Sequence, residues 1–182
     1  KVLGGYGDGG FITTNNKNLW KKMRRIRYMG IELKKKTKYF ALEHGTNSRL
    51  DEIQASILNF KLKKINQYIS TRKKNAKKYY ENLYKMNIIL PNNEMNKDDV
   101  YYEFVVRSKK RDKLLKQLKR NKINLKITYP YPIYKMKPYK KFYDKKLEKT
   151  EKFSKEIFSL PVYPGIKERE IKIICNNLIK NL

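Results

Sequence analysis

The order of hydrophobic patterns over residues 100–182 is the feature that most narrows the folds open to this chain. Residues 100–107 are rich in β-branched and aromatic side chains, which predicts a strand. Amphipathic helical patterns and one further extended run follow, at 111–121, 123–128, 148–158 and 167–181. This β-α-β-α-α order predicts a small α+β unit whose helices pack on one face of a short sheet.

Helical patterns also precede that unit. Asn16 is placed to cap a helix that Gly30 ends, and Phe11–Thr14 before it is a short β-like run. Further helices are expected from Leu50 onward and over 68–86, and the apolar side chains on one side of the first are expected in the core; they are Ile53, Ile57 and Phe60. We therefore predict two parts, the end of a larger domain in residues 1–68 and a small α+β domain in 69–182.

The formal net charge of +28 raises the alternative of a basic nucleic-acid-binding module. Lysine outnumbers arginine 36 to 9. Arginine is the side chain better suited to nucleic acid, because its planar guanidinium can donate two hydrogen bonds to a phosphate or to a guanine edge. Lys, Asn, Ile and Tyr make up close to half of the chain, and all four use A- and T-rich codons. Because the lysines are spread along the whole length, genomic base bias is the favoured cause of the charge, and a phosphate-bearing partner is compatible with it.

Cysteine usage and apolar runs bear on the compartment. The single cysteine, Cys175, cannot form an internal disulfide and is expected to be a buried free thiol on the last helix. No apolar run approaches the ~20 residues that a membrane span needs, and no signal segment opens the chain. These observations favour a cytoplasmic protein with no membrane partner.

Residues 1–14 hold five of the eight glycines in a turn that leads into the extended run. Such a turn can hold a phosphate through backbone N–H groups, or can simply be tight. It lacks the Gly-Lys-Ser/Thr of a Walker loop. A second stretch, 45–58, places Asn47 and Arg49 just ahead of a helix N-terminus, where anions are favoured. The alternative is that Asn47 or Ser48 only caps that helix.

Together these stretches resemble the DegT/DnrJ/EryC1/StrS family of pyridoxal-phosphate (PLP) sugar aminotransferases. Lys1 followed by Gly7-Asp8-Gly9-Gly10 is similar to the family's cofactor lysine and its glycine turn. The residues that are similar to the family's Gly-x-Asn-x-Arg-Leu-Asp segment and its Gln-Ala continuation are Gly45, Asn47, Arg49, Leu50, Asp51, Gln54, Ala55, Ile57 and Leu58. Three later segments also resemble the family: Arg72-x-x-x-Ala76-x-x-x-Tyr80, Tyr129-Pro-Tyr-Pro-Ile-Tyr and Leu160-Pro-Val-Tyr-Pro.

The resemblance implies an α/β fold, the PLP-dependent transferase fold type I of aspartate aminotransferase, of which this chain would be a fragment: the end of the large domain plus the small α+β domain. Lys1 would bind PLP covalently and then transfer protons, which requires a neutral amine. Asn47 would reach the cofactor phosphate of the neighbouring subunit in a homodimer with shared active sites. Arg49 would face phosphate or substrate, and Asp8 would shape the turn.

The implied reaction moves an amino group from an amino acid, usually glutamate, to a nucleotide-linked keto-sugar. A lysine at position 1 favours transamination over the dehydration that some relatives perform, although loss of catalysis or another PLP reaction stays open. Many relatives carry histidine where this chain has Tyr134, whose hydroxyl can replace a hydrogen bond to substrate but not a cation. His44 is expected to be an ordinary loop residue, and no metal site is expected. Because the family's ring-stacking residues precede the lysine, we expect a longer protein and an inactive fragment.

Overall fold

The computed structural model describes residues 1–32, 39–91, 98–143 and 145–182. The chain falls into two compact units, one formed by Lys1 with residues 3–64 and the other by Val2 with residues 65–182. The units therefore divide after Lys64, and the domain boundary after residue 68 stays a prediction.

The second unit is built on two antiparallel strands, β1 (Phe104–Arg107) and β2 (Ile157–Leu160). Phe104 pairs with Leu160 and Val106 with Phe158, and these four side chains are buried on one face of the pair. Single bridges extend the sheet on both sides, from Ile89 to Arg107 and from Lys126 to Ser159. The alternation of burial along each strand leaves the opposite face more open.

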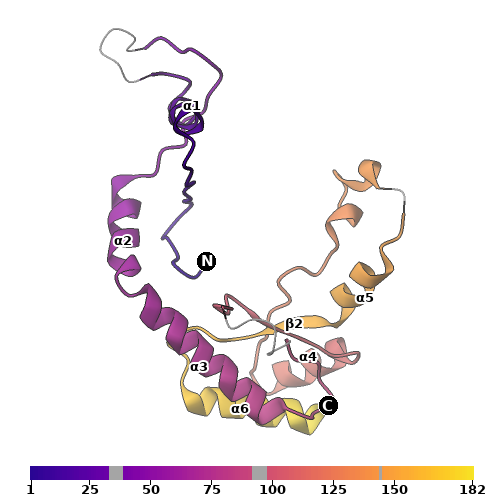
Figure 1. Cartoon of the computed structure of the whole chain (residues 1–182). Coiled ribbons are helices and arrows are strands. Elements are labelled where there is room, and N and C mark those ends of the chain that lie inside the picture. The colour runs from indigo at the N-terminus through magenta and orange to yellow at the C-terminus, as the bar shows by residue number, and fades with distance from the viewer. Residues whose placement is uncertain (33–38, 92–97, 144) are drawn as a thin grey trace. The chain divides into compact units, whose positions relative to one another are not determined.

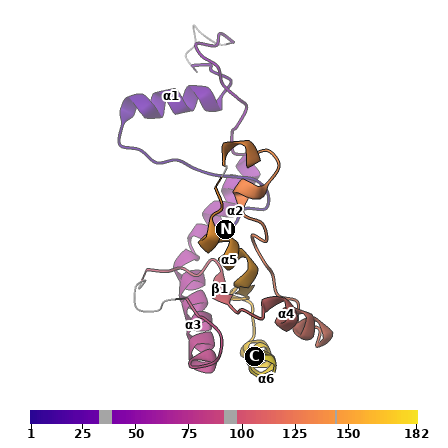
Figure 2. The same cartoon turned by 90° about the vertical axis from the view of Figure 1, so that its right-hand side faces the viewer.

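Helices cover the buried face, as the sequence predicted. They are α3 (Ile65–Leu83), α4 (Arg111–Arg120) and α6 (Glu168–Asn181), which lie on the same side of the strands in Figures 1 and 2. The Phe104 ring lies at the centre of the core, with the rings of Tyr79, Tyr80 and Tyr101 between 5.1 and 5.9 Å from it, centre to centre. Aromatic pairs at this spacing add to the free energy gained by burial.

The proline segment after β2 is held against α3 by side-chain bonds to its carbonyls. The Tyr79 hydroxyl donates to the Pro161 carbonyl oxygen at 2.9 Å, and the Asn75 amide donates to the Tyr163 carbonyl oxygen at 3.2 Å. Burial raises the pKa of Tyr79, so its hydroxyl stays a donor. Cys175 on α6 is a buried free thiol, as predicted, and burial raises the pKa of its thiol to about 11.

The predicted strand at 123–128 is wrong, because only Lys126 makes a bridge. The amides of Asn121, Lys122 and Ile123 instead donate to the last carbonyls of α4, with Lys122 in the left-handed region at φ +60°. At the other end, the Thr128 hydroxyl donates to the Glu103 carboxylate. At both ends of the segment, the hydrogen bonds are therefore made to groups other than the backbone of a neighbouring strand.

The helix predicted at 148–158 is too long, because its last two residues belong to strand β2. Helix α5 (Glu148–Glu156) ends where the Ser108 amide donates to the Glu156 carbonyl oxygen, and the chain continues directly into the strand. The predicted strand at 100–107 likewise shortens to β1, because Tyr101 takes φ +46° and its amide donates to the Asp99 carboxylate. A pattern of apolar residues does not mark such a helix-to-strand change.

The first unit contains α1 (Lys17–Arg27) and α2 (Glu52–Leu62). The Asn16 side chain caps α1 by accepting from the amides of Asn18 and Leu19, as predicted. The core assigned to α2 is wrong: no residue of this helix is buried, and Ile53 is 76% exposed. Phe11–Thr14 also forms no strand in the structure, and part of the predicted loop at 31–45 lies outside the described residues.

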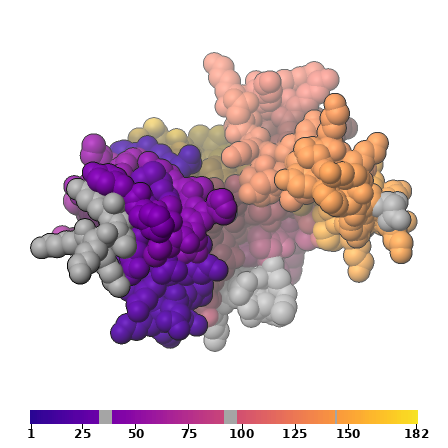
Figure 3. Space-filling model, turned by 90° about the horizontal axis from the view of Figure 1, so that it is seen from above, coloured from indigo at the N-terminus to yellow at the C-terminus, as the bar shows by residue number. Residues whose placement is uncertain are grey.

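Residues 129–147 connect the Lys126 bridge to α5 and contain two single-turn 3₁₀ helices, η1 (Ile133–Lys135) and η2 (Lys140–Phe142). We call this segment the arm. In Figure 1 it leaves the strands and returns through α5, and in Figure 3 its orange atoms gather in one lobe. Prolines at 130 and 132 remove backbone donors, which is why neither strand nor α-helix continues there.

The core predicts that Phe104→Ala lowers the free energy of unfolding by about 3–5 kcal/mol, because it removes a fully buried ring and leaves a cavity. Urea denaturation measures the change. Val105→Ala, one residue along the strand on the open face, is the control and should cost about 1 kcal/mol or less. Equal losses in the two variants would contradict the placement of the core.

Candidate functional site

The stretch that carries Asn47 is fixed by backbone bonds to the end of α1. The Thr46 amide donates to the Ile26 carbonyl oxygen at 2.8 Å, and the Ser48 amide donates to the Arg27 carbonyl oxygen at 3.0 Å. Asn47 itself forms an antiparallel bridge with Tyr28. These bonds satisfy carbonyls that a helix end leaves unpaired, so the stretch is a C-terminal cap of α1.

Two glycines make this close approach possible. A β-carbon on Gly45 would lie 2.2 Å from the Gly30 amide nitrogen, and one on Gly30 would lie 1.7 Å from the Glu43 carbonyl oxygen. Gly30 also has φ +75°, which L side chains rarely adopt. The sequence predicted Gly30 as the C′ residue of α1, which is wrong by one position. The C-cap is Tyr28, Met29 takes the left-handed C′ conformation at φ +56°, and Gly30 follows as C″, with its amide donating to the Arg25 carbonyl oxygen as in a Schellman motif.

Asn47 and Arg49 lie side by side, as their spacing predicted. The Arg49 Nε–H donates to Asn47 Oδ1 at 3.4 Å, and the guanidinium lies over the Tyr28 ring at 4.9 Å. The terminal guanidinium nitrogens and the Asn47 amide nitrogen remain as donors for an anion. Neither Asn47 nor Ser48 caps α2, because its N-cap residue is Asp51. The pair is therefore suited to hold a phosphate or carboxylate oxygen.

The glycine turn after Lys1 is held by α2. Gln54 Oε1 accepts from the Tyr6 amide at 3.0 Å, and a β-carbon on Gly7 would lie 2.8 Å from Gln54 Nε2. Two turns further along α2, the Lys61 ammonium donates to the Gly4 carbonyl oxygen at 2.5 Å and lies over the Tyr6 ring. Gly4 takes φ +68° in this turn. The two sequence motifs thus meet within one unit, and α2 sets the path of the backbone that carries Lys1.

Tyr134 lies on the arm, in the other unit. Its hydroxyl donates to Glu151 Oε1 at 2.5 Å, and Lys135 forms an ion pair with Glu151 Oε2 at 2.8 Å. Loss of hydration and then the bond to Glu151 raise the pKa of Tyr134, while Lys135 and then Tyr134 lower the pKa of Glu151. Both shifts keep a neutral hydroxyl bound to an ionised carboxylate near neutral pH.

The structure thus brings Lys1, Asn47 and Arg49 into the first unit and Tyr134 into the second. Sequence reasoning missed the partners that hold them, namely Gln54, Lys61, Tyr28 and Glu151. Gln54 lies in the segment that resembles the family, but the resemblance did not indicate that its side chain contacts the turn after Lys1. His44 is exposed in its loop, as expected.

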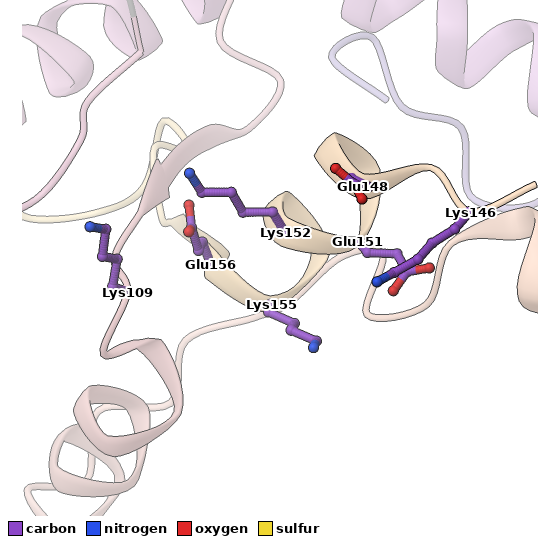
Figure 4. A pocket seen from close by; sticks show the side chains of 7 residues that line it. All are labelled: Lys109, Lys146, Glu148, Glu151, Lys152, Lys155 and Glu156. Carbon is purple, nitrogen blue, oxygen red and sulfur yellow. The ribbon is translucent and has the colours of Figure 1, made fainter.

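Other candidate sites are weaker. A hollow along α5 is lined by four lysines and three glutamates, so that both signs of charge are mixed there (Figure 4); they are Lys109, Lys146, Glu148, Glu151, Lys152, Lys155 and Glu156. Glu156 is already paired with Arg107 at 3.1 Å. In the described part of the chain, no group of three or more His, Cys, Asp or Glu could hold a metal ion. No helix among the same residues is long and apolar enough to cross a bilayer.

The clamp on the turn predicts that Gln54→Met speeds hydrogen exchange at the Tyr6 amide roughly two- to tenfold, because methionine keeps the length but loses the acceptor. Hydrogen–deuterium exchange with mass spectrometry of a peptide covering the turn measures this. Asn59→Ala, at an exposed position on the same helix, should leave the exchange unchanged. Unchanged exchange in Gln54→Met would show that the bond does not hold the turn.

Solved structures share this architecture over nearly the whole chain. The S. venezuelae DesV protein, in complex with a ketimine intermediate, superimposes with a TM-score of 0.91 at 30% identity, over 99% of this chain and 48% of that one. The ntda protein of Bacillus subtilis, with bound cofactor PMP, gives a TM-score of 0.82 at 26% identity, over 92% and 40%. These neighbours confirm that the chain is a mixed α/β part of the fold of PLP-dependent sugar aminotransferases.

Sequence comparison agrees. The dTDP-3-amino-3,4,6-trideoxy-alpha-D-glucose transaminase of Micromonospora megalomicea subsp. nigra is 38% identical over 173 residues, which are 91% of this chain and 46% of that protein. The chain spans about half the length of the curated relatives it matches. The family model matches residues 1–179. With the lysine turn and the Asn47–Arg49 pair inside that match, the chain belongs to the DegT/DnrJ/EryC1/StrS aminotransferase family.

Proposed function

We propose that the protein carrying this chain is a PLP-dependent aminotransferase that moves an amino group from an amino acid, with glutamate as the expected donor, to a nucleotide-linked keto-sugar. The observation that carries the proposal is the clamp of Gln54 on the turn that follows Lys1, within a family match that runs from Lys1 to residue 179. The cytoplasm is the proposed compartment, and amino-sugar synthesis for surface polysaccharide is the proposed role.

The residues present fit PLP. An amine on a backbone with a fixed path suits a covalent link, and the Asn47 and Arg49 donors suit phosphate oxygens. The two donors come from a stretch fixed by backbone bonds, so they need little reordering when an anion binds. When bound, PLP supplies an electron sink for the negative charge that forms at the substrate carbon.

Each side chain then has a defined task. Lys1 holds the cofactor through its amine, and once released it moves a proton at the substrate carbon. Gln54 and Lys61 keep the backbone of Lys1 in place by holding the turn at the Tyr6 amide and the Gly4 carbonyl. Asn47 and Arg49 orient the anion. Tyr134, held by Glu151, offers a hydroxyl oxygen that can accept a hydrogen bond from substrate, but it cannot supply the positive charge of a histidine.

Loss of the proposed cofactor lysine is the direct test. Lys1→Ala should abolish the covalent attachment of PLP, seen as loss of the visible absorbance of the purified protein and of hydride-fixed cofactor in its mass spectrum. Glutamate-dependent amination should fall with it, by at least about a hundredfold. The control is Lys17→Ala, an exposed lysine on α1 that should retain both. Covalent cofactor in Lys1→Ala would refute the assignment.

A shared site between two subunits makes a separate prediction. If Asn47 of one subunit completes the site around Lys1 of the other, then Lys1→Ala and Asn47→Ala proteins, each weak alone, should complement each other after mixing and reassembly. Half of the randomly assembled dimers would be mixed, each with one intact site, so activity should return to about a quarter of the wild-type value. No recovery in mixtures with verified subunit exchange would place Asn47 in the same subunit's site.

A further inference from the structure

Helix α5 is held to the rest of its unit by polar contacts and not by the hydrophobic core. The helix has one buried residue, and that residue is a carboxylate, Glu156. The hydrophobic cluster around Phe104 is built from described residues outside α5. Figure 1 shows the helix leaving the strand pair at β2. Its direction is therefore set by contacts other than apolar packing in the core.

The Arg107 side chain holds the last turn of α5 in two ways. Its Nε and Nη2 groups donate to Glu156 Oε2, at 3.3 and 3.1 Å. Its guanidinium lies over the Phe153 ring, with 3.9 Å between Cζ and the ring centre. Phe153 and Glu156 are three residues apart and so lie on the same side of the helix. One planar cation thus binds a carboxylate and a ring together, which a lysine ammonium does less well.

The backbone of Arg107 has partners on both sides. Its amide and its carbonyl each form a 2.9 Å hydrogen bond with Ile89, and the residue pairs with Ile157 across the two strands. Ile157 directly follows α5, so no loop separates the helix from β2. The side chain that holds α5 therefore starts from a backbone that the sheet fixes.

Arg111, at the start of α4, adds a second contact. It is buried, and its Nη1 group donates to the carbonyl oxygens of Ser154 and Ile157. The last carbonyls of a helix have no partner within the helix, and a cation is favoured beside them. Arg111 thus fixes where α5 ends, whereas the contacts of Arg107 with two side chains fix how the helix is oriented.

The orientation of α5 determines where Glu151 lies. Glu151 is five residues before Glu156 on the same helix, and Figure 4 shows both side chains. Glu151 Oε1 accepts from the Tyr134 hydroxyl at 2.5 Å, and Oε2 pairs with Lys135 at 2.8 Å. The 3₁₀ helix η1 is therefore tied to α5 through one carboxylate. A change in the direction of α5 moves Glu151, and with it the Tyr134 hydroxyl.

We propose that Arg107 is a positioning residue that acts through α5 and Glu151 on the hydroxyl of Tyr134, and the functional part of this inference rests on the proposed function. Loss of the Arg107 side chain leaves the buried Glu156 carboxylate without its cation and lets α5 change direction. The Tyr134 hydroxyl then lies less often where it can accept a hydrogen bond from substrate. A displacement of about 1 Å is enough to weaken such a positioned contact strongly.

Spin labels measure the orientation of α5 without substrate. In the complete protein, Lys113→Cys on α4 and Lys149→Cys on α5 place labels at two exposed positions, and labelled subunits are diluted with unlabelled ones. Cys175 is buried, and burial raises the pKa of its thiol to about 11, so it does not take up the label. Double electron–electron resonance should give a distance distribution roughly twice as broad in Arg107→Ala as in the protein with Arg107.

Steady-state kinetics with glutamate and a nucleotide-linked keto-sugar give a second reading. Arg107→Ala should raise the KM for the keto-sugar about tenfold and leave kcat and the KM for glutamate within about twofold. Arg107→Lys keeps the charge but not the planar stacking, so it should recover part of both losses. Because both changes act on one hydrogen bond, Arg107→Ala/Tyr134→Phe should have the same KM as Tyr134→Phe.

The matched control is Lys109→Ala, which removes an exposed cation that lines the hollow of Figure 4 together with Glu156. It should leave the label distances and the KM unchanged. The proposal is wrong if Lys109→Ala has the effects of Arg107→Ala, if folded Arg107→Ala keeps the original distances, or if the KM effects of Arg107→Ala and Tyr134→Phe multiply. If Arg107→Ala does not fold, Arg107→Lys and Glu156→Gln decide, and unchanged distances in both overturn the proposal.

The two readings separate this proposal from the proposed function. A wild-type protein that takes no amino group from glutamate would refute the aminotransferase, while the label distances would still test the hold of Arg107 on α5. Broadened distances with an unchanged KM for the keto-sugar would overturn the positioning role and leave the aminotransferase intact.

Discussion

The backbone contact between Gly30 and Gly45 is the constraint on which the first unit depends. In that unit, where the structure describes residues 1–32 and 39–64, neither α1 nor α2 has a buried residue. Its order comes from backbone bonds instead, with the amides of Thr46 and Ser48 donating to the end of α1. Such bonds form only if the two chains approach closely, and a β-carbon at Gly45 would overlap the Gly30 amide. The position of Asn47 follows from this contact and not from packing.

The second unit relies on the opposite principle. Phe104, the rings around it and the apolar faces of α3, α4 and α6 form a core that excludes water, and burial supplies most of its stability. The arm lies outside this core and keeps its aromatic rings exposed.

The sequence was informative where local rules apply. The Asn16 cap, the end of α1 within three residues of Gly30 and the helices facing one side of a short sheet follow from hydrogen-bonding groups and from the apolar period. It failed where tertiary contacts decide. Ile53 has the spacing of a core residue but is exposed, and Ile157 and Phe158 continue a helical pattern although they belong to β2. The site residues came from a family resemblance, and no pattern in the chain showed that Gln54 holds the turn.

Tyr134 shows how a substitution at one position depends on its neighbours. A histidine at this position could be cationic next to Glu151, and the pair would then bind each other by charge. Tyrosine stays neutral, so Lys135 supplies the cation that Glu151 needs, at 2.8 Å. Three further lysines, Lys140, Lys145 and Lys146, line the same pocket as Tyr134, so the positive charge at this place is carried by neighbouring side chains and not by residue 134.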